Sequence, residues 1–495
     1  MLHTISPQDM QEMERAFLNG TAYPSMLLME HAAQAVVECL ERYAKKDGRV
    51  LFVCGGGNNG GDGCAAARIW MQRGGKADVW LMTSPSRMKG DAGVNACLLG
   101  VCGANMTILY GDAPEIGADC CAVVDALFGT GLSRALEGAA LSAVQRINES
   151  GLPVIAVDIP SGVDGATGQI LGEAVRADAT VTFHRPKHGH LLFPGRALSG
   201  ALTIADIGIL PEWDGAQGIE VLEREDAKAL LPVRTRDAHK GTFGHVLVVA
   251  GSEGMAGAAC LSAQAALRSG TGLVTVGCCA PVRLPMQNLV PCAMTKVVST
   301  GAALDAGAAL ELYNLAQGKK ALAIGPGLGT QENTWRAISQ LICSDIPKVI
   351  DADALNLLAR HGGRVGKNTV LTPHPGEMAR LTDAQVEEIL ASPVEYAQQL
   401  AQDMDCCVLL KGATTVIVRG EEAAMNVTGC DAMGTGGCGD VLTGVIAGLM
   451  AQGMTPYDAA RVGAYYHGVA GEEAASARGS RAVTAWDVCD CLRIE

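Results

Sequence analysis

Short apolar runs that lead into glycine-rich loops recur along this chain, and they constrain its fold more than any other feature. The runs are residues 49–54, 77–82, 122–125, 153–158, 245–250, 273–277, 321–324 and 348–353. Runs of this length without polar alternation are typical of parallel strands that are buried on both faces. Several of the loops open a stretch with helical periodicity, such as residues 64–73 and 255–269. The sequence therefore predicts an α/β fold built on parallel sheets.

The chain is too long for one hydrophobic core. At 495 residues it is expected to form two or three domains. Residues 207–220 are rich in glycine, proline and polar side chains, which is typical of a linker. A new helix is expected at Glu225, ending before Pro232. We therefore predict a first domain over residues 1–214 and a second over residues 222–495.

Charge and cysteine usage narrow the possible partners. The net charge of −14 argues against a nucleic-acid surface. The 18 cysteines include adjacent pairs and show no zinc-type spacing, so we expect reduced thiols in a cytoplasmic protein. The N-terminus lacks the pattern of a signal peptide, and no apolar run is long enough to span a membrane. We expect a homo-oligomer without nucleic-acid or membrane partners.

The glycine loop near the C-terminus carries the clearest chemical signal. Four of the six residues from Gly434 to Gly439 are glycine, and an apolar helix is expected over residues 441–450. Bare N–H groups and the positive end of a helix dipole together favour a phosphate. Asp440 lies where a carboxylate could take a proton from a hydroxyl that attacks a phosphoryl group. The alternative is a plain glycine turn in which Asp440 only caps the helix.

The first half has three loops of similar construction. Residues 55–63 combine glycines with two asparagines and Asp62, which can bind hydroxyls or supply oxygen ligands to a cation. Asp125 and Asp158 each end a predicted strand and precede a glycine loop, so they are expected at the ligand-binding edge of the sheet. Tight turns and helix caps are the alternative interpretation. Lys89 is a weaker candidate for an acid or base in this half, since an exposed lysine is most often only a solvated charge.

The motifs GGGNNGGDG, VDALFGTGL and VDIPSGVDG together resemble the NAD(P)H-hydrate epimerase family over roughly the first two hundred residues. The resemblance implies a Rossmann-like three-layer domain that interconverts the R and S epimers of NADHX and NADPHX, the hydrated forms of NADH and NADPH. It implies that the dinucleotide is held by Asn58, Asn59, Gly60, Gly61, Asp62, Gly129, Thr130, Gly131, Leu132, Ser133, Arg134, Ala135 and Asp158. It also implies that Asn59, Asp125 and Ser161 bind potassium, and we take Asp158 as the candidate acid or base.

The second half adds three polar features of its own. Asp351 and Asp353 end a predicted strand and could bind a metal or only organise loops, the commoner role. His374 lies between two prolines, which favours a positioned group over a buried bystander. Lys411 is expected in the turn of a hairpin within residues 408–418, where it could simply face solvent.

The motifs GSEGMAGAA, GPGLG, VIDADALN, LTPHPGEM, LLKGATTVI and GTGGCGDVLTG resemble the NAD(P)H-hydrate dehydratase branch of the ribokinase-like superfamily, from about residue 222 to the C-terminus. The resemblance implies a ribokinase-like α/β domain that binds ADP with Mg²⁺. Carried over, the nucleotide contacts are Lys411, Gly412, Ala413, Thr414, Thr415 and Gly439. The contacts to the hydrate are Ala256, Gly327 or Gly329, His374 and Asp440.

These inferences give one hypothesis and two alternatives. The first domain would epimerise NAD(P)HX, and the second would dehydrate the S form while ADP becomes AMP and phosphate, with Asp440 as the base. The alternative enzyme is a small-metabolite kinase of the ribokinase-like superfamily fused to a Rossmann-like domain. A nucleotide-sensing or protein-interaction role for the first half is the non-enzymatic alternative. Nothing in the residues favours ADP over ATP.

Overall fold

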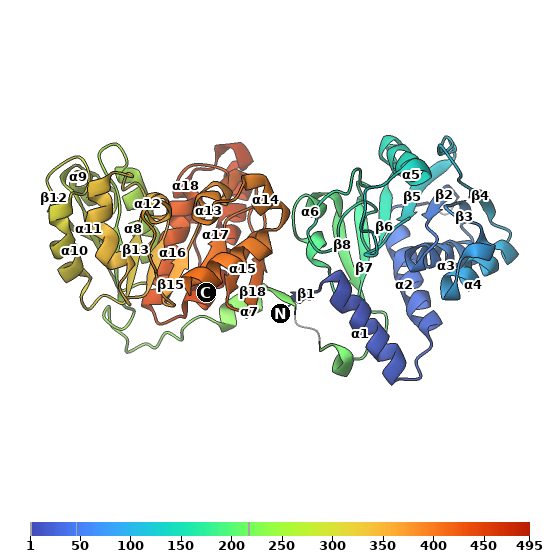
Figure 1. Cartoon of the computed structure of the whole chain (residues 1–495), viewed down its shortest axis with the longest axis horizontal. Helices are drawn as coiled ribbons and strands as arrows, with labels where there is room; N and C mark the ends of the chain where they lie inside the picture. The colour runs from blue at the N-terminus through green and yellow to red at the C-terminus, as the bar shows by residue number, and fades with distance from the viewer. Residues whose placement is uncertain (1, 46, 216–217) are drawn as a thin grey trace. The chain divides into compact units, whose positions relative to one another are not determined.

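The computed structural model describes residues 2–45, 47–215 and 218–495 (Figure 1). Residue 1 of the predicted first domain and residues 216 and 217 of the linker-like stretch lie outside the described residues. The described residues form two compact units, one within residues 3–219 and one made of residues 220–495 together with Leu2. The short strands β1 (Leu2–Thr4) and β9 (Ile219–Val221) lie where the chain passes from one unit to the other.

The first unit is built on a parallel sheet with the strand order β4-β3-β2-β5-β6-β7-β8. Its strands are β2 (Arg49–Cys54), β3 (Lys76–Leu81), β4 (Asn105–Ile108), β5 (Cys120–Ala126), β6 (Val154–Val157), β7 (Ala179–Phe183) and β8 (Ala201–Ala205). Its helices are α1 (Pro7–Gly20), α2 (Ser25–Leu40), α3 (Asn58–Gln72), α4 (Gly90–Val101), α5 (Gly138–Glu149) and α6 (Gly195–Leu198).

Alternate strand residues face opposite sides of this sheet and make two separate cores. Phe52 and Val124 pack with the apolar faces of α1 to α4, whereas Val53 and Val123 pack with α5. Figure 1 labels these helices around the sheet. The result is a three-layer, Rossmann-like arrangement, as predicted. The strand order reverses between β2 and β5, so the loops that follow these two strands meet at the topological switch point, where open α/β sheets bind ligands.

The second unit also has a mostly parallel sheet, with the order β9-β18-β17-β16-β15-β14-β13-β10-β11-β12. Its strands after β9 are β10 (His245–Val249), β11 (Leu273–Cys279), β12 (Met294–Ser299), β13 (Ala321–Ile324), β14 (Lys348–Ile350), β15 (Thr369–Leu371), β16 (Cys407–Leu410), β17 (Thr415–Arg419) and β18 (Glu422–Asn426). The pairs β16–β17 and β17–β18 are antiparallel, which confirms the predicted hairpin.

The helices of the second unit cover both faces of its sheet (Figure 1). They are α7 (Arg224–Ala229), α8 (Ala256–Arg268), α9 (Ala280–Leu289), α10 (Ala309–Ala316), α11 (Glu332–Ile342), α12 (Asp353–His361), α13 (Pro375–Thr382), α14 (Val386–Ala391), α15 (Pro393–Met404), α16 (Cys438–Ala451), α17 (Pro456–Arg478) and α18 (Ala485–Asp490). The largest core joins α8, α16 and α17 to one face of the sheet. The order reverses between β10 and β13, which sets a second switch point.

Two predicted helix starts were wrong. Helix α3 begins at Asn58 rather than at residue 64, so most of the glycine-rich stretch at residues 55–63 forms helical turns. Helix α16 begins at Cys438 rather than at residue 441. In both cases packing overrides the low helix propensity of glycine. A Cβ at Gly60 would meet the Gly55 carbonyl oxygen at 1.9 Å, and a Cβ at Gly437, the N-cap of α16, would meet Leu261 at 2.6 Å.

None of the described helices combines the length and the apolar character needed to cross a membrane. Ten of the 18 cysteines are buried and all are free thiols. Most of them therefore act as small core residues.

Candidate functional sites

The glycine loops after β2 and β5 approach each other at the switch point of the first unit. A Cβ at Gly129 would lie 3.1 Å from both Asn59 Oδ1 and Asp158 Oδ2, so only a glycine leaves this gap open. Both polar atoms of the Asn59 amide are buried and have no hydrogen-bond partner in the protein. A buried amide without partners is costly, and it therefore marks a place for a ligand or an ion.

Asp125 is the penultimate residue of β5. Its Oδ1 accepts hydrogen bonds from Ser161 Oγ at 2.6 Å and from the Leu127 N–H at 3.2 Å, while Oδ2 accepts the Ser161 N–H at 2.8 Å. Ser161 Oγ also accepts the Phe128 N–H at 2.9 Å. Burial raises the pKa of Asp125 to about 6, against the effect of these hydrogen bonds. Asp125 thus organises its loops, and its charge is still incompletely balanced.

Asp158 follows β6 with a φ of 65°, a left-handed conformation that costs a non-glycine residue energy. Its Oδ1 accepts the Lys187 ammonium at 2.7 Å and Thr182 Oγ1 at 3.2 Å. Lys187 is buried and also donates to Thr182 Oγ1 at 3.0 Å and to the Phe183 carbonyl at 3.3 Å, which uses its three hydrogens. Burial opposes the charge of Asp158, but the Lys187 charge and hydrogen bond outweigh it and lower its pKa.

The charges of the Asp158–Lys187 pair also affect the pKa values of two further carboxyl groups. Burial raises the pKa of Asp62 well above its ordinary value, and the charges of Asp158 and Glu14 add to this shift. Burial also raises the pKa of Glu14, a residue of α1, and Asp158 adds to it. Carboxyl groups whose environments drive their pKa values apart are typical of acid–base sites.

The structure does not gather all the predicted dinucleotide contacts equally. Asn58, Gly131, Ser133, Arg134 and Ala135 are exposed, while Gly60 and Gly61 are buried in α3. A Cβ at Gly165 would touch both Pro7 of α1 and Thr130, so Gly165 lies between the start of α1 and the Gly129–Ala135 loop. The weaker candidate, Lys89, is exposed at the start of α4.

In the second unit, the glycine loop ends at the start of α16. Gly437 is the N-cap with a φ of 99°, a conformation that side chains other than glycine rarely adopt. Asp440 is therefore the third residue of the helix and not its cap, so the plain capping interpretation was wrong. Burial raises the pKa of Asp440 to about 7, the charge of Asp351 adds to the shift, and Lys411 opposes it.

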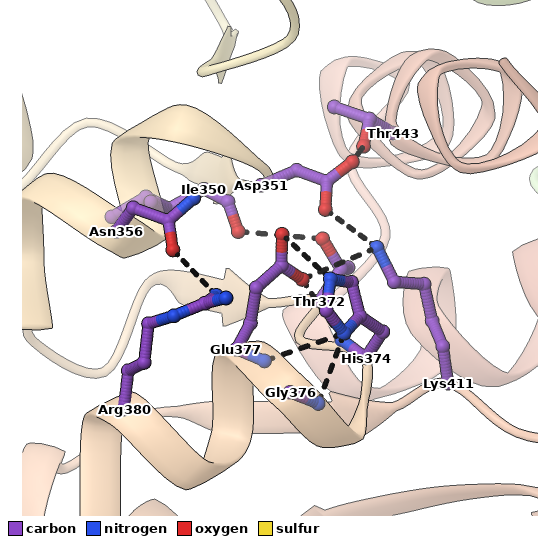
Figure 2. Close-up of polar contacts among 10 residues, drawn as sticks. All are labelled: Ile350, Asp351, Asn356, Thr372, His374, Gly376, Glu377, Arg380, Lys411 and Thr443. Atoms are coloured by element: carbon purple, nitrogen blue, oxygen red, sulfur yellow. Dashed lines mark hydrogen bonds and ion pairs between the residues drawn. The ribbon is translucent and has the colours of Figure 1, made fainter. Parts of the chain in front are cut away.

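Lys411 does not lie free in solvent, because two carboxylates hold it (Figure 2). Its Nζ lies 2.7 Å from Asp351 Oδ1 and 3.8 Å from Glu377 Oε2. A Cβ at Gly439 would lie 3.4 Å from Lys411 Nζ and 3.7 Å from Asp351 Oδ2. The hairpin turn thus brings its ammonium to the N-terminus of α16, where both residues were predicted to contact the nucleotide.

His374 caps helix α13 (Figure 2). Its Nδ1 accepts the N–H groups of Gly376 at 3.0 Å and Glu377 at 3.3 Å, so the neutral ring carries its hydrogen on Nε2. The Nε2 atom lies 3.5 Å from Glu377 Oε1, and the side chain is 51% exposed. His374 is therefore a positioned donor and not a buried bystander.

Among the remaining predicted residues, Ala256, Gly327 and Gly329 lie next to the second switch point. Gly327 follows β13, and a Cβ on it would touch Met255 and Ala258 beside Ala256 at the start of α8. Gly329, the other candidate after β13, donates its N–H to Asp353 at 2.8 Å. The other residues of the nucleotide set, Gly412, Ala413, Thr414 and Thr415, lie at the hairpin turn or just after it, and the first two are exposed.

Lys187, Glu14 and Glu377 were not predicted as site residues. Each is a common surface residue type, and its sequence neighbours do not indicate that it is buried beside another charge. Glu377 alone had a local signal, because a carboxylate three residues after a helix cap is typical of a capping box.

Two family models match the chain. The one described as NAD(P)H-hydrate dehydratase matches residues 246–493, and the one described as YjeF-related protein N-terminus matches residues 25–189.

Similar curated proteins extend over almost the whole chain. The bifunctional NAD(P)H-hydrate repair enzyme Nnr of Moorella thermoacetica is 39% identical over 513 residues, which cover 99% of this chain and 96% of that protein. The Nnr enzyme of Escherichia coli is 34% identical and covers 97% of this chain and 91% of its own length. The crystal structure of the ADP/ATP-dependent NAD(P)H-hydrate dehydratase of Bacillus subtilis, co-crystallised with ATP and Mg²⁺, has a TM-score of 0.50 at 33% identity. It covers 56% of this chain and 97% of its own.

Proposed function

This chain belongs to the family of bifunctional NAD(P)H-hydrate repair enzymes, and we propose that its two units divide the two reactions between them. The protein is an enzyme with an isomerase activity, which interconverts R- and S-NAD(P)HX, and a lyase activity, which converts S-NAD(P)HX to NAD(P)H as ADP becomes AMP and phosphate. Epimerisation is placed in residues 1–214 and dehydration in residues 222–495.

Asp440 is proposed as the base of the dehydration. It takes the proton of the hydrate hydroxyl, and the hydroxyl oxygen attacks the terminal phosphoryl group of the nucleotide. The ring nitrogen then expels phosphate from C6, and loss of a C5 proton restores the dihydronicotinamide double bond. A pKa of about 7 suits a base that must be ionised and still accept a proton at neutral pH. The position of this carboxylate, after a glycine loop and inside the first turn of α16, is the observation that carries the proposal.

The nucleotide is assigned to the hairpin turn and the start of α16. Lys411, Gly412, Ala413, Thr414, Thr415 and Gly439 are the proposed contacts, and the N–H groups between Gly434 and Gly439 would receive the phosphates. No group of three or more His, Cys, Asp or Glu side chains among the described residues is arranged as a metal site. We therefore place Mg²⁺ on the phosphates of the nucleotide, where it neutralises charge on the transferred group.

The hydrate of the second unit is assigned to Ala256, Gly327, His374 and Asp440. His374 offers its Nε2 hydrogen to an acceptor on the substrate, because Nδ1 is already engaged by two backbone N–H groups. Ser262 of α8 donates to the Asp440 carbonyl oxygen at 3.0 Å, and this bond ties α8, which begins at Ala256, to α16.

Asp158 is the proposed acid–base group of the epimerase site. Lys187 engages its Oδ1, which leaves Oδ2 facing Asn59 and Gly129 in the gap between the glycine loops. The substrate is assigned to Asn58–Asp62 and Gly129–Ala135 on the two sides of this gap, together with Asp158. Epimerisation at C6 needs a bond at that carbon to break and re-form. Removal of the hydroxyl proton lets the C6–N1 bond open to an aldehyde while N1 takes up a proton, and N1 then adds to the other face of the carbonyl as the oxygen regains its proton. The ionised Asp158 is proposed to remove the hydroxyl proton.

Potassium is proposed at Asn59, Asp125 and Ser161. The orphaned Asn59 amide oxygen, the incompletely balanced Asp125 carboxylate and the Ser161 hydroxyl fit a large monovalent cation better than Mg²⁺. The ion would balance Asp125 and fix the loops that carry Gly129 and Ser161.

We also propose a homo-oligomer in the cytoplasm; the 18 free thiols support a reducing compartment.

Incubation with mixed NADHX epimers and ADP tests the proposed function. The protein should restore NADH absorbance from both epimers and release one AMP and one phosphate per NADH. If ADP is omitted, the epimers should interconvert without recovery of NADH. A stable phosphorylated product without NADH would favour a metabolite kinase and overturn the assignment.

A further inference from the structure

Asp351 lies at the centre of the polar network of the second unit and binds two different elements (Figure 2). Its Oδ1 accepts the Lys411 ammonium at 2.7 Å, and its Oδ2 accepts Thr443 Oγ1 at 2.7 Å. Lys411 comes from the turn after β16 and Thr443 from the first turns of α16. Resting on the proposed dehydration, we infer that Asp351 is a positioning residue that fixes Lys411 relative to α16 and so aligns the nucleotide phosphates with Asp440.

Burial makes this junction rigid. The Asp351 side chain is 2% exposed and Thr443 is fully buried, so water cannot replace either hydrogen bond. Both oxygens of the carboxylate are committed, one to each element. Thr443 follows Asp440 by three residues, which places the two side chains on the same side of the helix.

The opposite side of the junction is also fixed. Ser262 holds the Asp440 carbonyl oxygen from α8, so α16 is tied near its N-terminus to α8 and to Asp351. Ala352, directly after Asp351, has a φ of 51° and a ψ of −121°, a strained conformation for an alanine. Such strain persists where surrounding contacts over-determine the backbone, and it is common at functional sites.

The charges around Asp440 make it possible to distinguish a positioning role of Asp351 from simple structural support. Asp440 faces Asp351 after β14, Asp353 at the start of α12 and Lys411 after β16, with Cys438 on its own helix. Lys411 in turn faces Glu377 of α13 and His467 of α17. Asp351 and Lys411 therefore act on Asp440 with opposite signs.

The test is the pH dependence of dehydration of pure S-NADHX with ADP. Activity should rise with pH as Asp440 ionises. In Asp351→Asn the like charge beside Asp440 is lost, so the midpoint of the rise in activity should move down by about 1 pH unit. Because Lys411 and α16 also lose their shared anchor, we expect kcat to fall about 100-fold. In Lys411→Met a cation is lost, so we expect the rise to move up by about 1 pH unit and the KM for ADP to increase about tenfold.

Thr443→Val is the matched control, because it removes one anchor of Asp351 and keeps every charge. We expect kcat to fall about tenfold while the rise stays at its original pH. If Asp351→Asn and Lys411→Met lower the rate with no opposite shifts, Asp351 only supports the fold and the inference fails. Should Asp351→Asn not fold, an unmoved profile in Lys411→Met or a wild-type kcat in Thr443→Val would still overturn it. If the unaltered protein restores no NADH, the proposed function falls, and this inference falls with it.

Discussion

Each unit contains an aspartate that binds a lysine ammonium at 2.7 Å, and the two pairs act in opposite ways. In the first unit, Lys187 holds Asp158, the proposed acid–base group itself, and lowers its pKa. In the second unit, Lys411 holds Asp351, while the proposed base Asp440 remains outside the pair and its pKa is raised to about 7. The same chemical pair can therefore fix a carboxylate as an anion or leave its neighbour ready to exchange a proton.

The surroundings of the two lysines explain the difference. Lys187 is 2% exposed and donates to three acceptors, so it can only be a fixed internal cation. Lys411 is 22% exposed and lies beside Gly439, so part of it can meet a phosphate. The first lysine serves a residue, whereas the second can serve both a residue and a ligand.

The most drastic way to separate the two sites is to divide the chain. Residues 222–495 keep every strand from β10 to β18 and the core that joins α8, α16 and α17 to the sheet, and they lose only the short strand β9, so this fragment should fold alone. It should dehydrate only the S epimer and lose epimerisation completely, as measured by the amount of NADH recovered from an equal mixture of epimers. Equal consumption of both epimers by the fragment would mean that the first unit is not the epimerase.

Asp440→Asn keeps the shape of the proposed base and removes its charge. Dehydration of S-NADHX should fall by about two to four powers of ten, while ADP binding and epimerisation persist. NADH absorbance and calorimetric ADP binding provide the measurements. Asp403→Asn, an exposed position on α15, is the matched charge control and should change the rate less than twofold. Near-normal turnover of Asp440→Asn would remove this residue from the mechanism.

Lys187→Met removes the cation from the other pair. Asp158 would then be buried without its partner, its pKa should rise, and epimerisation should fall about 100-fold at neutral pH. The residual activity should need a higher pH than the wild type, since Asp158 must still ionise. Chromatographic separation of the epimers follows the reaction, and Lys89→Met is the exposed control. A uniform loss at every pH would indicate a structural role for Lys187.

Asp125→Asn tests the proposed potassium site with a smaller effect. Epimerisation should fall about tenfold and lose any stimulation by potassium, because the only carboxylate of the proposed ligand set is neutralised. Dehydration of pure S epimer should not change. Epimerisation by the wild type that is indifferent to replacing potassium by a large organic cation would count against the ion.

The stability of the same variant should depend on pH in a defined direction. The folded-state pKa of Asp125, about 6, lies above its ordinary value, so its contribution to stability is complete at low pH and is lost as the pH rises through 6. Without potassium, the stability of Asp125→Asn relative to wild type should therefore increase from pH 4 to pH 7, by about 1–2 kcal/mol. Denaturant unfolding at both pH values measures it, and a constant difference would contradict the raised pKa.

Local sequence patterns predicted several central strands of both sheets and placed candidate site residues in the loops that follow them. Uninterrupted apolar runs gave the strands at residues 49–54 and 321–324 with their observed ends. The starts of α3 and α16 were missed, because tight packing stabilises helical glycines that local propensity disfavours. The motifs also contain Asp125, Asp158, Lys411 and Asp440. They do not indicate which charged groups contact these residues in the fold and shift their pKa values.

By itself, the sequence determined the order of strands, glycine loops and helices, and the family to which the chain belongs. Only the tertiary structure decided which lysine meets which aspartate, since Lys187 lies 29 residues from Asp158 and Lys411 lies 60 residues from Asp351. Such pairs depend on how parallel strands line up at one edge of a sheet, which local periodicity does not encode. Burial and the nearby charges together then fix the sign of each pKa shift, because the cost of an ion depends on the solvent and charges around it and not on its neighbours in the chain.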